Sequence, residues 1–111
     1  MIDRIVLSNL LENEEYLRKV LPFIQKEYFS DTNEQIIFET INQHVSNYNE
    51  PPTKEALRYY IEEREDLNEE RYKEITNTIQ ELKAEESNID WLIDTTEKFC
   101  QDRAVYNAVR N

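Results

Sequence analysis

Apolar residues recur every three or four positions along most of the chain, which is the spacing of one face of an α-helix. The first such segment covers 2–10 and a second covers 16–21. Pro22 comes next, and an aromatic connector at 23–29 leads to a longer segment at 31–48. No stretch alternates apolar and polar residues with a period of two for long enough to form a strand. The pattern predicts an all-α fold.

Capping residues indicate where the later helices begin. Asp31 is followed three positions later by Glu34, the spacing of a capping box that satisfies two backbone N–H groups. The pair Pro51-Pro52 is the strongest break in the chain, because proline lacks a donor and forces its predecessor out of the helical region. A short polar turn at 85–88 is expected between the last two helices. The other expected N-caps are Thr53, Asn68 and Asn88.

The last third of the chain carries a narrow apolar stripe with coiled-coil spacing. Apolar positions from 72 to 82 are three, four and three residues apart, and those from 92 to 106 recur every seven. We expect 67–111 to fold as a long antiparallel helical hairpin attached to a small helical head at 1–66, within one domain. The alternative is that the stripe packs back onto the head.

Large apolar side chains in this hairpin exceed what the pairing of two helices would bury, which predicts self-association. We call these residues the predicted seam. The predicted seam consists of Tyr72, Ile75, Ile79, Leu82, Leu92, Phe99 and Tyr106.

Composition excludes several classes of function. The chain has 111 residues and no glycine, so it lacks a P-loop, a dinucleotide fingerprint, an EF-hand loop and a nucleophile elbow. Its 24 Asp and Glu against 13 Lys and Arg give a net charge of −11, which predicts weak or no direct DNA binding by this domain. Apolar runs of at most three residues are too short to cross a bilayer, so no membrane contact is expected.

Residues that could carry chemistry are few. His44 is the single histidine and Cys100 the single cysteine, so a metal site would have to rely on carboxylates. We therefore predict no metal or cofactor site and no catalytic residue. One cysteine without a disulfide partner, together with the lack of a signal-peptide pattern, indicates a cytoplasmic protein, in the host cytoplasm if phage-encoded.

Several short blocks are specific in their combined order and spacing. They resemble the N-terminal domain of the DnaB-type replicative DNA helicases, in particular the version in T-even-type phages. A glycine that bacterial members often carry in the first helix is absent, which favours the phage branch. The blocks are 5–11, Glu27-Tyr28-Phe29, Ile37-Phe38 with Ile41, the break at 47–53 with Ala56-Leu57, and the stretch from Trp91 to Ala104.

The resemblance implies a non-catalytic collar over a motor ring. In that family the domain does not hydrolyse ATP, pairs through its hairpin into a trimer of dimers and presents a docking surface for primase. ATP and Mg would belong to the motor domain, which this sequence lacks. Residues 104–111 are still predicted to be helical where the sequence ends, as expected of a collar separated from its motor. The exposed flank of the hairpin supplies the candidate primase-facing residues Arg71, Glu74, Asp94 and Lys98.

The alternative function is a small acidic adaptor, or a DNA mimic, that binds a host factor. The net charge of −11 favours it. A phosphate mimic should show uninterrupted acidic rows, whereas Lys and Arg interrupt the acidic residues at positions such as Arg58 and Arg64. The interleaved charges favour the helicase collar.

Overall fold

The computed structural model describes residues 1–110. Within this range the chain forms α-helices joined by short connections and contains no strand. The predicted all-α fold class is therefore confirmed. The helices are α1 (Ile2–Glu12), α2 (Glu14–Val20), α3 (Thr32–Tyr48), α4 (Lys54–Glu62), α5 (Glu69–Glu81) and α6 (Ile89–Arg110), with the short 3₁₀ helices η1 (Leu21–Phe23) and η2 (Lys26–Tyr28).

Side-chain caps begin these helices at the predicted places. Asp31 accepts hydrogen bonds from the backbone N–H groups of Asn33 and Glu34, with donor–acceptor distances of 2.7 and 3.3 Å. Thr53, Asn68 and Asn88 each accept from the backbone N–H three residues later. Each cap satisfies a donor that the first helical turn leaves without a partner.

Asn49 ends α3 in the left-handed region of the backbone map, at φ 58°. Because the sequence contains no glycine, asparagine takes this position, since it tolerates the left-handed region better than other side chains. Arg18 of α2 donates to the backbone carbonyl of Asn49 at 2.9 Å and to its side-chain oxygen at 3.2 Å. The turn after α3 is thereby tied to α2.

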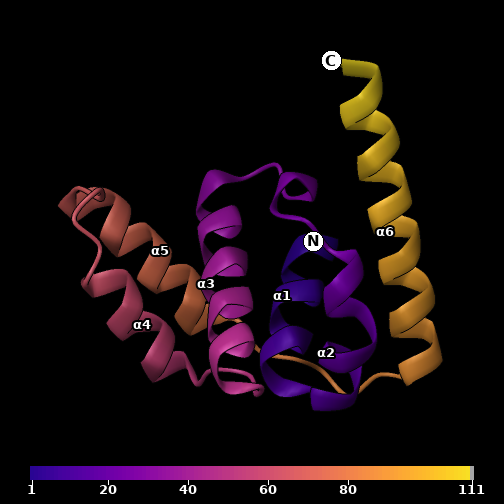
Figure 1. The fold of residues 1–111 in the computed structure, drawn as a ribbon, viewed down its shortest axis with the longest axis horizontal. Helices are drawn as coiled ribbons and strands as arrows, with labels where there is room; N and C mark the ends of the chain where they lie inside the picture. Colours follow the sequence, from indigo (N-terminus) through magenta and orange to yellow (C-terminus); the bar gives the residue numbers. More distant parts are fainter. Residues whose placement is uncertain (111) are drawn as a thin grey trace.

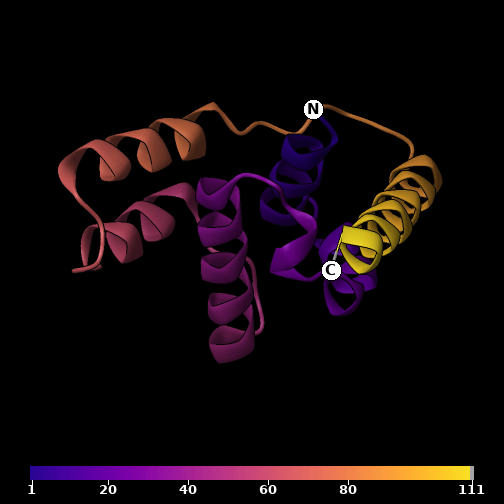
Figure 2. The same ribbon diagram turned by 90° about the horizontal axis from the view of Figure 1, so that it is seen from above.

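The centre of the molecule is formed by α1, α2 and α3, with α1 packed against both of the others. On one side α5 packs on α4 and α3, and on the other side α6 packs on α2 and η2 (Figure 1). Residues 82–88 connect α5 to α6 as an extended segment that runs along the edge of the molecule (Figure 2).

The predicted antiparallel hairpin over 67–111 is therefore wrong. Its two helices lie on opposite sides of the central helices instead of against each other (Figure 1). The connection is no tight turn, and it is held to the head where the Ala84 backbone N–H donates to the Glu12 carboxylate at 3.2 Å. The apolar stripe of α5 packs on α4 and α3, and that of α6 on α2 and η2, so the alternative of packing back on the head is the one observed.

A single hydrophobic core joins both sides of the molecule. Phe29 lies at its middle, with ring centroids 5.4 Å from Phe38 on α3 and 5.6 Å from Phe99 on α6. The buried Tyr16 hydroxyl and the Thr96 hydroxyl form a hydrogen bond of 2.6 Å between α2 and α6. Burial raises the pKa of Tyr16 to about 12, so this hydroxyl stays protonated and the bond is kept.

Candidate protein-interaction surface

Most of the predicted seam lies in the core and is not available to a second copy. Five of its side chains are at most 4% exposed. Tyr72 is half-buried, whereas Tyr106 is exposed. The seam is therefore wrong as a continuous surface, because its two halves cover different sides of one core. The five buried residues are Ile75, Ile79, Leu82, Leu92 and Phe99.

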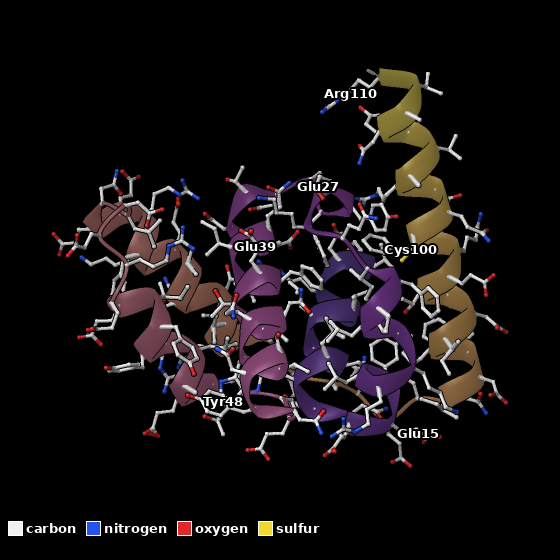
Figure 3. All side chains as sticks on the ribbon, viewed as in Figure 1. Glu15, Glu27, Glu39, Tyr48, Cys100 and Arg110 are labelled. Atoms are coloured by element: carbon white, nitrogen blue, oxygen red, sulfur yellow. The ribbon has the colours of Figure 1, made fainter. Side chains whose placement is uncertain are left out.

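Exposed apolar side chains gather instead at the C-terminal end of α6. Val105 is 63% exposed, Tyr106 58% and Val109 81%. The last turns of α6 extend beyond the other helices, with Arg110 at their end (Figures 1 and 3). Of these residues, the sequence pattern singled out Tyr106 alone. The four-residue spacing of Val105 and Val109 is the signal that could have identified the rest.

The side of α6 that faces away from the core carries a mixed surface, which we call the α6 outer face. At 100° per residue, its residues lie between about 105° and 165° around the helix from the buried stripe of Leu92, Thr96 and Phe99. Apolar side chains occupy its two ends, and a charged segment with the Lys98–Asp102 ion pair of 3.3 Å lies between them. The α6 outer face consists of Trp91, Asp94, Lys98, Val105 and Val109, all of them exposed.

An open groove of about 460 Å³ lies beside this face, between α6 and the α2–η1 segment. Val20, Ile93 and Ala104 supply apolar walls, and the exposed Phe23 ring stands at its rim. Cys100 points from α6 toward this side of the molecule (Figure 3). Burial and the nearby Glu97 carboxylate raise the pKa of the Cys100 thiol, which keeps it in the unreactive thiol form.

The four candidate primase-facing residues do not share one surface. Arg71 and Glu74 belong to α5, whereas Asp94 and Lys98 belong to α6 on the opposite side (Figure 1). Arg71 is half-buried and donates to the Asn33 side-chain oxygen at 2.9 and 3.1 Å, so it ties α5 to α3. The four residues do not share a surface because α5 and α6 lie on opposite sides of the central helices. Only Asp94 and Lys98 lie on the α6 outer face.

Comparison with known proteins shows which family this chain belongs to. The family described as the DnaB-like helicase N-terminal domain matches residues 1–95. The chain belongs to this family. It is also 33% identical over 104 residues to a DnaB-like replicative helicase of Enterobacteria phage T4, an alignment that covers 94% of this chain and 22% of that helicase. The resemblance to phage helicases that the sequence blocks indicated is confirmed.

Several sequence blocks of that family resemblance have visible structural roles. In the stretch from Trp91 to Ala104, Phe99 enters the core, and Arg103 binds Asp3 at the start of α1. Phe29, in an earlier block, contacts the Phe99 ring. This DnaB-like domain therefore uses these blocks to attach α6 to the head.

The remaining features concern metal binding, the single histidine and membrane contact. Among residues 1–110, no group of three His, Cys, Asp or Glu side chains is arranged to hold a metal ion. His44 shares a hydrogen bond of 2.8 Å with the Tyr60 hydroxyl, between α3 and α4. No helix in the same range is long and apolar enough to cross a membrane.

Proposed function

We propose that this chain is the non-catalytic N-terminal domain of a hexameric replicative DNA helicase and that α6 provides its contact with other copies. Family membership and the T4 replicative helicase support the first part. The second part rests on one observation, the exposed apolar end of α6 at Val105, Tyr106 and Val109. ATP hydrolysis would reside in a motor domain outside this sequence.

Exposure of this end has an energetic cost that self-association would remove. Fully burying a valine side chain contributes on the order of 1.5–3 kcal/mol. A stable interface commonly buries about 1,600 Å² in total, more than three side chains supply. We therefore include the adjoining groove and its exposed Phe23 rim in the contact between copies. The charged middle of the α6 outer face, at Asp94 and Lys98, stays outside this contact.

The same domain is proposed to dock a primase. Holding primase on the helicase raises its local concentration at the fork, so a modest contact suffices for primer synthesis near the unwound duplex. We place this contact on the charged middle of the α6 outer face, at Asp94 and Lys98, which are exposed. The net charge of −11 disfavours direct DNA binding by the domain, because the negative charge repels phosphate. Primase rather than nucleic acid is therefore the proposed partner.

The primase proposal predicts the behaviour of a charge reversal. Asp94→Lys combined with Lys98→Glu keeps the net charge and should weaken capture of the cognate primase about tenfold or more, since rim charges guide association. Capture by the immobilised domain is the measurement. Lys73→Glu on α5, whose side chain is exposed and pairs within its own helix, is the control and should leave capture unchanged.

Helical content by circular dichroism and mass by light scattering should stay the same in both variants, because surface substitutions usually change stability by under about 0.5 kcal/mol. Equal capture by the α6 variant and the wild type would place primase elsewhere on the domain. Failure of the wild type to capture its primase would refute this partner altogether.

A further inference from the structure

The backbone leading into α6 does not by itself fix the direction of that helix. Residues 82–88 are extended, without the hydrogen-bonded turns that would orient the next helix. Leu92 and Phe99 hold α6 to the head through apolar packing, which leaves the crossing angle of a helix free over a range of about 15–20° around a preferred value. Within that range, the direction of α6 depends on the directional polar contacts along its inner side, of which the buried Tyr16–Thr96 hydrogen bond is one.

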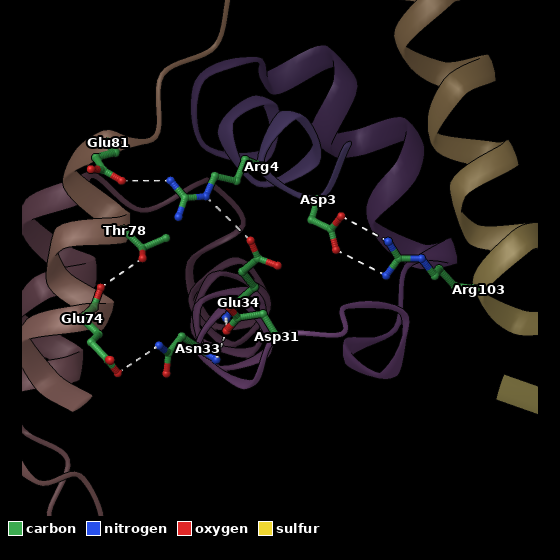
Figure 4. Close-up of polar contacts among 9 residues, drawn as sticks. All are labelled: Asp3, Arg4, Asp31, Asn33, Glu34, Glu74, Thr78, Glu81 and Arg103. Carbon is green, nitrogen blue, oxygen red and sulfur yellow. Dashed lines mark hydrogen bonds and ion pairs between the residues drawn. The ribbon is translucent and has the colours of Figure 1, made fainter. Parts of the chain in front are cut away.

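A second, two-pronged contact nearer the end of the helix joins Arg103 of α6 to Asp3 of α1 (Figure 4). The two terminal nitrogens of the Arg103 guanidinium donate to the two Asp3 carboxylate oxygens at 3.3 and 3.2 Å. One of them also donates to the Tyr28 backbone carbonyl at 2.6 Å, and the guanidinium carbon lies 4.9 Å from the centre of the Phe99 ring. Two parallel bonds to one carboxylate fix the plane of the guanidinium, which a single bond cannot do.

Arg103 is a contact close to the exposed apolar end of α6. Beyond it, α6 is held by the Asn107 side chain, which donates to the Glu27 backbone carbonyl at 2.9 Å. Val109 lies about 9 Å further along the helix axis than Arg103, at 1.5 Å per residue. Any change of angle at Arg103 therefore moves the exposed apolar end of α6.

At the other end of the ion pair, Asp3 lies in the first turn of α1, next to a residue that contacts α3 and α5. Asp3 and its neighbour Arg4 reach in opposite directions from the first turn of α1, Asp3 toward α6 and Arg4 toward α3 and α5 (Figure 4). Arg4 lies 3.8 Å from Glu34 and 2.9 Å from Glu81. The Asp3 side chain is 11% exposed and that of Arg103 is 27% exposed, so water screens this pair less than a surface pair.

We propose that the Asp3–Arg103 ion pair sets the direction of α6 relative to the head, which makes Arg103 and Asp3 positioning residues for the α6 interaction surface. The first turn of α1 thereby links the two outer elements, α5 through Arg4 and α6 through Asp3. The consequence for assembly rests on the proposed self-association of α6, whereas the direction of the helix does not.

The test measures the distance between two spin labels, one at position 42 on α3 and one at position 108 on α6, in a Cys100→Ser background. Both positions are exposed. Labelled protein is diluted into unlabelled protein so that distances within one chain are recorded. The intact domain should give one narrow distance distribution.

Arg103→Lys keeps the charge but loses the two-pronged contact, and it should broaden or shift that distribution. Asp3→Asn, which removes the ion pair and leaves the bond to the Tyr28 carbonyl, should broaden it less and covers the case in which the Lys variant does not fold. Arg18→Lys is the matched control, because Arg18 binds Glu14 and Asn49 and not α6, and it should leave the distribution unchanged.

Unchanged distributions in folded Arg103→Lys and Asp3→Asn would overturn the positioning role. Broadened distributions with weaker self-association by light scattering would support both the positioning role and its consequence for assembly. Broadened distributions with unchanged mass would support the positioning role and refute that consequence. A wild type that stays monomeric while the distances respond would refute the proposed self-association alone.

Discussion

Replacement of Phe99 by Asp should unfold the domain instead of separating its copies. The Phe99 side chain is 4% exposed and its ring packs against Tyr28 and Phe29 in the core. Loss of a buried Phe side chain alone costs about 3–5 kcal/mol, and a buried carboxylate adds a desolvation penalty. A domain of this size has about 5–15 kcal/mol in total, so most of its stability is lost. Urea denaturation followed by circular dichroism measures the effect.

Val109→Asp provides the matched control on the same helix. Val109 is 81% exposed, so the same new carboxylate remains in water and should change the free energy of unfolding by under about 0.5 kcal/mol. A stable, folded Phe99→Asp monomer would contradict the core position of Phe99. A seam exposed between two copies would instead give a folded monomer when Phe99 is replaced by Asp.

Val105→Asp combined with Val109→Asp should abolish self-association while leaving the fold intact. Both side chains are exposed on the last turns of α6, and loss of a central apolar anchor commonly costs 2 kcal/mol or more, about thirtyfold in affinity. Two added carboxylates would also face their counterparts on a second copy. Light scattering over a concentration series measures the mass, which should stay that of a monomer at concentrations where the wild type associates.

Asn77→Asp combined with Gln80→Glu is the control for this experiment. It adds the same two negative charges to exposed positions on α5, so it separates a local effect from general repulsion between acidic chains. This control should associate like the wild type. Equal association by the α6 variant and the wild type would remove α6 from the contact.

The sequence was sufficient for the features that depend on a few neighbouring residues. Asp31, Thr53, Asn68 and Asn88 cap helices where predicted, because each cap is a hydrogen bond to a backbone N–H two or three residues away. The cap at Asn13, which accepts from the Tyr16 backbone N–H, was missed although the same rule applies. Helical periodicity likewise identified the buried positions Ile75 and Ile79 of α5 and Leu92 and Phe99 of α6.

Contacts between distant segments were beyond the same reasoning. The spacing of Ile75, Ile79, Leu92 and Phe99 shows that each helix has an apolar stripe, but it does not show which surface covers that stripe. The Arg103–Asp3 pair joins residues 100 positions apart, and nothing in the local sequence of either one indicates the other. For this reason the sequence did not predict the α6 outer face, which depends on how α6 packs on the head.

Hydrogen exchange along α6 at low and high protein concentration tests the proposed contact most directly. Amide groups at 104–110 are at the exposed end of the helix, where fraying should make exchange fast in the monomer. If α6 joins the copies, exchange of these amides should slow as the concentration rises, while exchange across α4 and α5 stays constant. Slowing confined to α4 and α5, or no change anywhere along the chain, would contradict the assignment of α6 as the self-association element.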